Sequence, residues 1–179
     1  MFYSTWHESP FGRRRLLSDG ENLVGLGGEK TKYFPPTMPG GVQEEPDLPV
    51  FGATKSWLDS YFAGRQPAIS DLPLAPAGSD FRKAVWDVLC GIPYGQWTTY
   101  GQVAKLVARR LGRKSMSGQA VGGAVGHNPI GIIIPCHRVV GANGSLTGYG
   151  SGLDLKARLL AHEGVDLSGF FIPRRGTAL

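Results

Sequence analysis

Apolar residues recur every three or four positions in several stretches of the chain, a spacing typical of helices with one buried face. The apolar positions of the four clearest stretches are Trp57, Leu58, Tyr61 and Phe62; Phe81, Val85, Val88 and Leu89; Val103, Leu106, Val107 and Leu111; and Leu155, Leu159 and Leu160. They predict helices over about 53–62, from Ser79 to the Gly91-Ile92-Pro93 break, from Thr98 or Thr99 through Arg109, and over 154–162.

Short alternating segments dominate the first 30 residues and predict β-strands. Arg13 to Leu17 and Asn22 to Leu26 are the strand candidates, joined by the turn Ser18-Asp19-Gly20. Residues 31–50 are rich in Pro and Gly and are expected to be loop. A second Pro-rich stretch, 66–78, suits a linker between domains.

A helix-turn-helix is predicted in the middle of the chain. The helix ending near Arg109 is followed by the turn Leu111-Gly112-Arg113-Lys114, and Ser115 or Ser117 can cap a second helix that ends near Gly126. That second helix contains several glycines, each of which costs about 1 kcal/mol relative to Ala. Two explanations remain open: close packing against another helix, or close approach to a narrow nucleic-acid groove.

The longest apolar run, Ile132 to Ile134, leads into Pro135-Cys136-His137-Arg138-Val139-Val140. Such a run predicts a strand buried on both faces, ended as a pairing partner by the proline. The following Gly141-Ala142-Asn143-Gly144 predicts a hairpin turn, which after a helix-turn-helix would form a wing. The glycine-rich segment 147–152 is expected to be a flexible loop that closes over a ligand.

These elements divide the chain into an α/β domain at 1–78, including the linker, a winged helix-turn-helix-like domain at 79–170, and a tail at 171–179. The length suffices for two small domains with their own cores. No window is long and apolar enough for a membrane span, and the N-terminus lacks the pattern of a secretory signal. A reduced, cytoplasmic setting is expected, near the nucleoid if the source is bacterial.

The distribution of charge points to a polyanionic partner. The chain has a net charge of +5, and no Asp or Glu occurs between Asp87 and Asp154. The cations in that interval are Lys105, Arg109, Arg110, Arg113, Lys114 and Arg138. They predict a face that meets nucleic-acid phosphate, with an ordinary solvated basic surface as the alternative.

Cys90 and Cys136 are the only cysteines. Two cysteines form no disulfide framework, and with four scattered histidines they suggest no metal site, so we expect neither metal nor cofactor. Cys90, at the end of an apolar helix, is expected to be a packed core thiol. Cys136 beside His137 is either another inert core thiol or a nucleophile next to a proton acceptor.

The second domain closely resembles the O6-alkylguanine-DNA alkyltransferases, also called methylated-DNA–protein-cysteine methyltransferases. The resemblance covers about Phe81 to Val165 and is carried by several motifs in the same order and spacing. They are Ala120-Val121-Gly122, Asn128-Pro129, Pro135-Cys136-His137-Arg138-Val139, Thr147-Gly148-Tyr149, and Leu159-Leu160 with Glu163-Gly164. The first domain matches loosely, in a position that suits the family's ribonuclease-H-like domain.

The resemblance implies single-use DNA repair, in which the alkyl group of O6-alkylguanine moves irreversibly to Cys136. His137 is then a relay base acting through water, oriented by Glu163, while Asn128 braces the active-site turn and Tyr100 assists the leaving guanine at N3. The implied substrate and DNA contacts are Arg113, Lys114, Gln119, Ala120, Gly122, Gly123, Val139, Tyr149, Gly150 and Ser151. The partner is double-stranded DNA with a flipped-out O6-alkylguanine. A monomer is expected, with cooperativity on DNA left open.

Two residues depart from the pattern of many family members. Gln119 stands where an arginine fills the vacated base stack, and Gly150 followed by Ser151 stands where a serine follows the loop tyrosine. Both bear on substrate range. Other classes considered are a sensor of alkylated bases without turnover, a winged-helix regulator and a Cys-His hydrolase. The last is disfavoured because adjacent side chains of an extended segment point to opposite sides.

Overall fold

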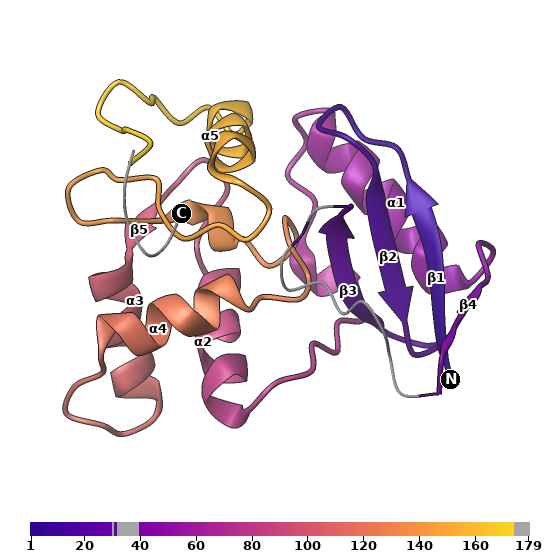
Figure 1. Ribbon diagram of the computed structural model, residues 1–179, viewed down its shortest axis with the longest axis horizontal. Helices are drawn as coiled ribbons and strands as arrows, with labels where there is room; N and C mark the ends of the chain where they lie inside the picture. Colours follow the sequence, from indigo (N-terminus) through magenta and orange to yellow (C-terminus); the bar gives the residue numbers. More distant parts are fainter. Residues whose placement is uncertain (30, 32–39, 174–179) are drawn as a thin grey trace. The chain divides into compact units, whose positions relative to one another are not determined.

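The computed structural model describes residues 1–29, 31 and 40–173 (Figure 1). The chain forms two compact units, the first comprising 1–77 with 129–131 and the second 78–128 with 132–179. The α/β class with two units is as predicted from the hydrophobic pattern.

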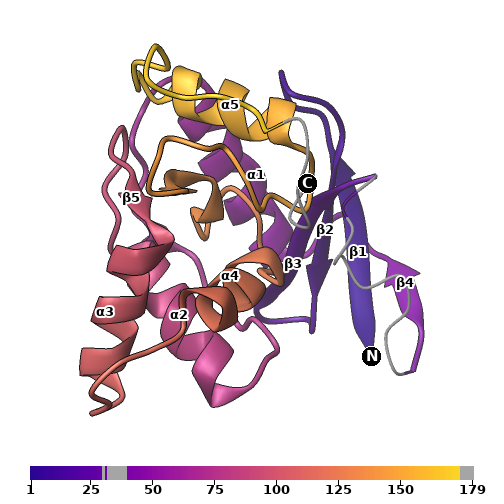
Figure 2. The same ribbon diagram turned by 60° about the vertical axis from the view of Figure 1, so that its left-hand side comes forward.

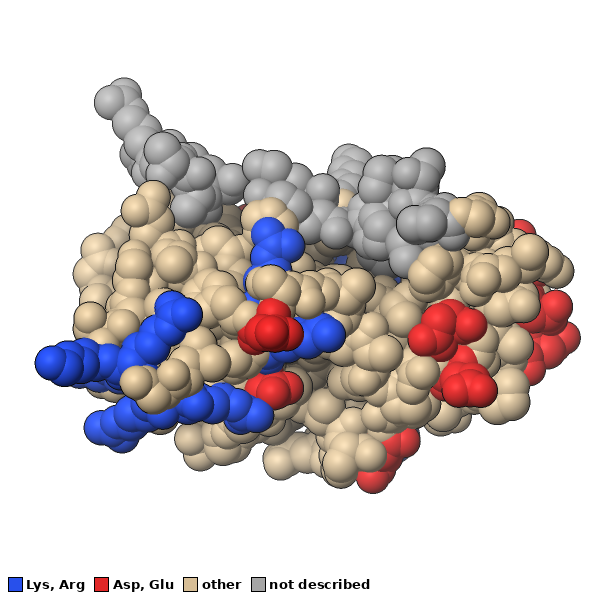
Figure 3. Space-filling model, turned by 90° about the horizontal axis from the view of Figure 1, so that it is seen from below, with Lys and Arg blue, Asp and Glu red and all other residues tan. Residues whose placement is uncertain are grey.

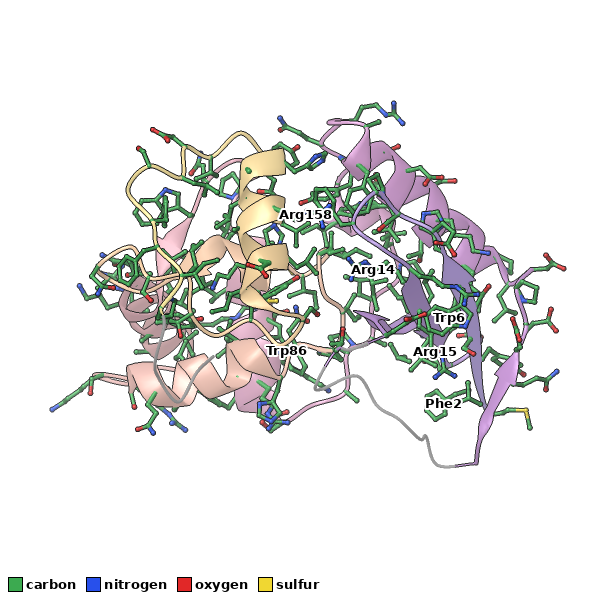
Figure 4. The ribbon with its side chains drawn as sticks, turned by 45° about the horizontal axis from the view of Figure 1, so that its top comes forward. Phe2, Trp6, Arg14, Arg15, Trp86 and Arg158 are labelled. Atoms are coloured by element: carbon green, nitrogen blue, oxygen red, sulfur yellow. The ribbon has the colours of Figure 1, made fainter. Side chains whose placement is uncertain are left out.

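The first unit is built on a four-stranded sheet in the order β3-β2-β1-β4. Its strands are β1 (Phe2–His7), β2 (Arg14–Ser18), β3 (Leu23–Gly28) and β4 (Val42–Glu44). Neighbouring strands are antiparallel except β4, which runs parallel to β1. Helix α1 (Pro49–Phe62) packs on β2 and β3, and η1 (Ile69–Asp71) follows it. Figure 4 labels Trp6 and Arg15 on neighbouring strands; Arg15 lies 5.9 Å from the Trp6 ring centroid.

Two expectations for residues 31–50 are corrected. Val42–Glu44 is a strand, because its backbone pairs with β1 although its side chains are mostly polar and exposed. The following helix begins at Pro49 and not near residue 53, since proline is well suited to a helix's first position. The predicted loop at 32–39 lies outside the described residues.

The second unit contains α2 (Asp80–Cys90), β5 (Thr98–Thr99), α3 (Tyr100–Arg110), α4 (Gly118–Gly126), η2 (Cys136–Arg138), β6 (Val139–Val140) and α5 (Leu153–His162). The predicted caps are confirmed, since the hydroxyls of Ser79, Thr99 and Ser117 each accept a bond from a backbone N–H in the first turn of α2, α3 and α4. Figures 1 and 2 show α2, α3 and α4 grouped together, and each contacts the other two.

The side chain of Trp86 (labelled in Figure 4) links helix α2 to helix α4 of the helix-turn-helix. The fully buried indole of α2 donates from Nε1 to the Ala124 carbonyl near the end of α4, over 2.9 Å. That carbonyl lies in the last turn, where helix carbonyls lack helical partners. The bond therefore supports a glycine-rich helix whose own propensity is poor.

The run Ile132–Val140 is buried throughout, as expected, but the predicted strand is wrong. Residues 131–133 form a turn and residue 134 a bend, Cys136–Arg138 is one turn of 3-10 helix, and only Val139–Val140 is a strand. Ile132 has φ 71°, the only positive φ of a non-glycine residue in the described chain. An apolar run reports burial, and it does not distinguish a strand from a buried turn that other residues brace.

The wing hairpin is also corrected. Strand β6 pairs in parallel with β5, through Thr98 with Val139 and Thr99 with Val140. The tight turn after β6 is present, closed by a bond from Gly141 N to Ser145 O. Instead of a returning strand, Ser145 bridges Phe171, the residue at which the predicted tail begins. Residues 174–179 of that tail lie outside the described residues.

Candidate active site

Cys136 lies in η2, directly after the strained turn at Ile132, and its residue is 6% exposed. The carboxamide of Asn128, two residues beyond the end of α4, holds this turn. Asn128 Nδ2 donates to the Ile134 carbonyl over 2.8 Å and to Cys136 Sγ over 3.1 Å. The thiol is therefore fixed in place by a residue from the end of the helix-turn-helix.

His137 is fully buried next to the thiol and is oriented by Glu163, the residue that caps the C-terminus of α5. His137 Nε2 and Glu163 Oε1 are 2.7 Å apart. Because an ionised carboxylate can only accept, Nε2 carries the proton and Nδ1 is the free lone pair of a neutral ring. His137 Nδ1 has no hydrogen-bond partner among the described protein atoms.

Glu163 receives further donors. Arg138 Nε donates to Oε2 over 2.8 Å and Arg138 Nη2 to Oε1 over 3.0 Å, while Gly95 N donates to Oε2 over 3.1 Å. Gly95 has φ 74°, and a Cβ there would lie 2.9 Å from the Glu163 carbonyl oxygen, so a side chain would be strained twice. The loop between α2 and β5 thus closes around the carboxylate.

The burial of these groups sets their protonation. Burial raises the pKa of the Cys136 thiol, opposed by the Asn128 hydrogen bond and the charge of Lys156. Burial lowers the pKa of His137, opposed by its hydrogen bond to Glu163. Burial also resists ionisation of Glu163, but the bonds from His137 and Arg138 outweigh it and hold its pKa at about 2. At neutral pH the site is a neutral thiol, a neutral imidazole and a carboxylate.

Lys156 is a functional-site residue that the sequence interpretation missed. Its side chain is fully buried in α5, and Nζ donates to the carbonyls of Val139, over 2.5 Å, and Thr147, over 2.6 Å. The signal was present in the periodicity: Lys156 shares the helix face of Leu159 and Leu160, whereas Leu155, expected inward, is only half-buried. A lysine on an apolar helix face indicates a buried amine with partners.

Tyr100, at the start of α3, meets the same carbonyl as Lys156. Its Oη donates to Thr147 O over 2.9 Å, and burial raises its pKa, so the phenol stays protonated. Gly148 lies against this hydroxyl so closely that a Cβ there would overlap Tyr100 Oη, and its φ is 76°. The predicted substrate loop is thereby tied to α3 and α5. Within it Tyr149 is buried, and Gly150 and Ser151 are half-buried.

The predicted DNA-contacting residues of the helix-turn-helix are on the surface. Gln119, Ala120 and Gly123 of α4 are exposed. Gly122 lies against the Tyr100 ring, since a Cβ at Gly122 would be 3.8 Å from a ring carbon. A Cβ at Gly118, Gly123 or Gly126 would meet nothing within 4 Å. Close packing inside the chain therefore does not account for these three glycines.

The basic face is also present, with one correction. Lys105, Arg109, Arg110, Arg113 and Lys114 are exposed, and Figure 3 shows Lys and Arg side chains gathered over the end of the second unit. Arg110 is paired with Asp87 over 2.8 Å. Arg138, which the sequence grouped with this face, is buried against Glu163, because the carboxylate and the Ile92 carbonyl satisfy its donors.

The described residues contain neither a cluster of metal ligands nor a membrane-spanning helix. Among residues 1–29, 31 and 40–173, no three His, Cys, Asp or Glu side chains cluster so as to hold a metal ion. In the same residues no helix has the length and apolarity of a membrane span. Cys90 is half-buried in α2, and burial raises its pKa to about 11.

Comparison with known protein families accounts for nearly the whole chain. The 6-O-methylguanine DNA methyltransferase DNA-binding domain matches residues 80–165, and the ribonuclease-like domain of the same methyltransferase matches residues 1–76. The chain belongs to the 6-O-methylguanine DNA methyltransferase family. The resemblance drawn from the sequence motifs is confirmed, and it extends to the first domain.

Individual methyltransferases of this family are similar over most of their length. The chain is 41% identical to the methylated-DNA–protein-cysteine methyltransferase of Haemophilus influenzae, covering 90% of this chain and 86% of that protein. It is 44% identical to the enzyme of that name from Methanosarcina acetivorans, covering 92% and 99%.

Solved structures of family members have the same fold. The O6-methylguanine methyltransferase of Mycobacterium tuberculosis has a TM-score of 0.76 at 38% identity, covering 91% of this chain and 93% of that chain. A crystal structure of Mycobacterium tuberculosis OGT in complex with DNA has a TM-score of 0.76 at 36% identity, covering 90% and 91%. The ribonuclease-like and helix-turn-helix-like fold classes predicted for the two units are confirmed.

Proposed function

We propose that this protein repairs DNA by transferring the alkyl group of O6-alkylguanine to Cys136. The observation that carries the proposal is the buried Cys136 thiol, held by Asn128 beside a histidine that Glu163 orients. This arrangement stands in a chain whose relatives are methylated-DNA–protein-cysteine methyltransferases. The S–C bond formed is a thioether, which has no ready leaving group, so each molecule acts once.

The proton of the thiol leaves through His137. Cys136 is buried and its pKa is raised, so a base is needed to form the thiolate. His137 Nδ1 is the lone pair available for this, and a water between Nδ1 and Sγ carries the proton. Glu163 holds the proton on Nε2 and stabilises the imidazolium that results. The thiolate then attacks the alkyl carbon, and the bond from that carbon to guanine O6 breaks.

Guanine has to leave with a proton, so that the net reaction moves the thiol proton to the base. Tyr100 serves as the donor at guanine N3, since its raised pKa keeps the phenol protonated, and the proton held by His137 returns to Tyr100 through water once the base has left. Its present acceptor, the Thr147 carbonyl, also receives Lys156 Nζ and remains satisfied when Tyr100 turns to the substrate. Loss of negative charge from the leaving base lowers the barrier to transfer.

The flipped base is read by backbone and loop groups. The backbone of Val139 and the loop residues Tyr149, Gly150 and Ser151 contact its edge. Contact to O6 comes from the Gly150 amide or the Ser151 hydroxyl. Flipping is needed because a buried thiol cannot reach O6 within the base stack.

The helix-turn-helix binds the duplex. The exposed small residues Ala120 and Gly123, with Gly122 beside them, let α4 approach the minor groove closely. Gln119 fills the vacated stack, and Arg113 and Lys114 contact phosphates. We infer a monomer acting on double-stranded DNA in the cytoplasm, in the nucleoid if the source is bacterial.

Intact-mass analysis tests the proposal. Incubation with a stoichiometric duplex containing O6-methylguanine is expected to add one methyl group to the Cys136 peptide. Cys90→Ala should accept the methyl group as the unchanged chain does, while Cys136→Ala should bind the duplex and accept none. Binding without any adduct would identify a sensor of alkylated bases and refute the proposal.

A further inference from the structure

Arg138 is a buried arginine whose charge the sequence pattern assigned to a DNA-binding face. Its side chain is 7% exposed, and its carboxylate partner Glu163 is fully buried. Nε and Nη2 grip the two oxygens of Glu163, and Nη1 donates to the Ile92 carbonyl over 2.5 Å. Each of the three guanidinium nitrogens thus has an acceptor, and losing one would leave a buried, charged donor unsatisfied.

Arg138 and His137 share one carboxylate. Glu163 Oε1 accepts from His137 Nε2 and from Arg138 Nη2, at 2.7 and 3.0 Å. A bare carboxylate at that distance, away from water, favours the protonated imidazolium strongly. An imidazolium has no lone pair at Nδ1 and cannot take a proton from the thiol. A second cation on the same carboxylate weakens this stabilisation of the imidazolium, and the hydrogen bond that orients the His137 ring remains.

We propose that Arg138 is a positioning residue that keeps His137 neutral, by sharing Glu163 with it, so that His137 Nδ1 accepts the Cys136 proton. This inference rests on the proposed function of Cys136 as alkyl acceptor. It assigns Arg138 to the proton path instead of to the DNA surface.

The other charged and titratable groups around His137 also affect its protonation. Lys156 from α5 adds a second positive charge, and both cations oppose protonation of His137, as burial does; Glu163 favours it. Cys136 adjoins His137 in η2 and is neutral at neutral pH. From the packed α2 and the loop after it come Asp87, Cys90 and Tyr94. Asp87 is paired with Arg110, Cys90 feels the charges of Asp87 and Arg138, and Tyr94 feels those of Glu163 and Arg138. Arg138 donates to both oxygens of Glu163, through Nε and Nη2.

The first test measures His137 directly and needs no substrate. Nitrogen chemical shifts of labelled histidines, followed against pH in the unchanged protein, identify the His137 signal by its loss in His137→Gln. The expected result is a neutral ring protonated on Nε2, which stays neutral to lower pH than an exposed histidine. A His137 signal that is already imidazolium at neutral pH overturns the proposal, whatever the protein does to DNA.

The second test compares Arg138→Met with Arg138→Lys in single-turnover methyl transfer from an O6-methylguanine duplex. Arg138→Met removes the charge and keeps an apolar stem, so His137 becomes protonated at higher pH and the acid limb of the rate profile moves up. The ratio of the rate at about pH 8 to that at about pH 6 is expected to exceed the ratio of the unchanged protein by roughly tenfold. Arg138→Lys keeps the charge and should restore most of the original ratio.

The outcomes separate this inference from the proposed function. If the unchanged protein transfers no methyl group, the proposed function fails, and the histidine titration repeated in Arg138→Met and Arg138→Lys still decides the role of Arg138. If transfer occurs and both variants keep the original pH ratio, the charge of Arg138 does not act on His137. Loss of structure in Arg138→Met, seen by circular dichroism, leaves Arg138→Lys and the histidine titration as the deciding measurements. A pH ratio in Arg138→Lys raised roughly tenfold would then overturn the proposal.

Discussion

Asn128→Ala should uncouple the active-site turn from the helix-turn-helix. The substitution deletes the donor to the Ile134 carbonyl and to Cys136 Sγ, at 2.8 and 3.1 Å. The Ile134 carbonyl keeps its bond from Cys136 N, so it is not left unsatisfied. Two lost bonds of about 1 kcal/mol each, and a small cavity, give a loss of about 2–3 kcal/mol in the free energy of unfolding.

The same change has a chemical consequence. The Asn128 hydrogen bond opposes the rise in pKa that burial imposes on the Cys136 thiol. Without it the thiolate is harder to form, so Cys136 is expected to titrate at higher pH and transfer at neutral pH to slow. Thiolate absorbance followed against pH in a Cys90→Ala background, where Cys136 is the only thiol, measures this.

Asn143→Ala is the matched control, because Asn143 is exposed and its side chain accepts a local bond from Ser145 N within the same turn. Its cost by urea denaturation should be below about 1 kcal/mol. The reasoning is refuted if Asn128→Ala costs no more than Asn143→Ala, or if Cys136 titrates at the same pH with and without the carboxamide.

Three further outcomes are expected. Gly148→Ala should lower the rate of methyl transfer more than Gly152→Ala. Both glycines have positive φ, but only a Cβ at Gly148 overlaps Tyr100 Oη. Equal transfer rates in the two variants would show that this overlap has no effect. Gly123→Ala should raise the free energy of unfolding by about 0.5–1 kcal/mol, because alanine favours the helix and its Cβ meets nothing in the chain. The added methyl group should weaken binding of the duplex. Unchanged affinity in a filter-binding assay would show that α4 does not contact DNA closely. Burial lowers the pKa of Lys156 to about 8, so the unfolded chain binds more protons between there and 10.5. The free energy of unfolding of the unchanged protein should therefore rise over that range relative to Lys156→Met. A flat difference in denaturation experiments would count against a lowered pKa for Lys156.

Local signals in the sequence determined the helices of the second unit. Ser79, Thr99 and Ser117 cap α2, α3 and α4 by bonds to residues three positions away, which depend on no distant contact. The order of motifs around Cys136 and His137 identified the family for the same reason, because spacing along the chain is preserved in the sequence. Burial of Ile132–Val140 could also be predicted from its apolar side chains.

Only the tertiary structure decided the conformation and partners of that buried segment. The turn at Ile132 and the 3-10 turn at Cys136 depend on Asn128, which reaches them from the end of α4. The fate of Arg138 depends on Glu163, 25 residues further on. A charged side chain is exposed unless a distant partner satisfies it, and one sequence does not show which distant groups meet. The sequence therefore predicted which residues react, and the fold decided which charges surround them.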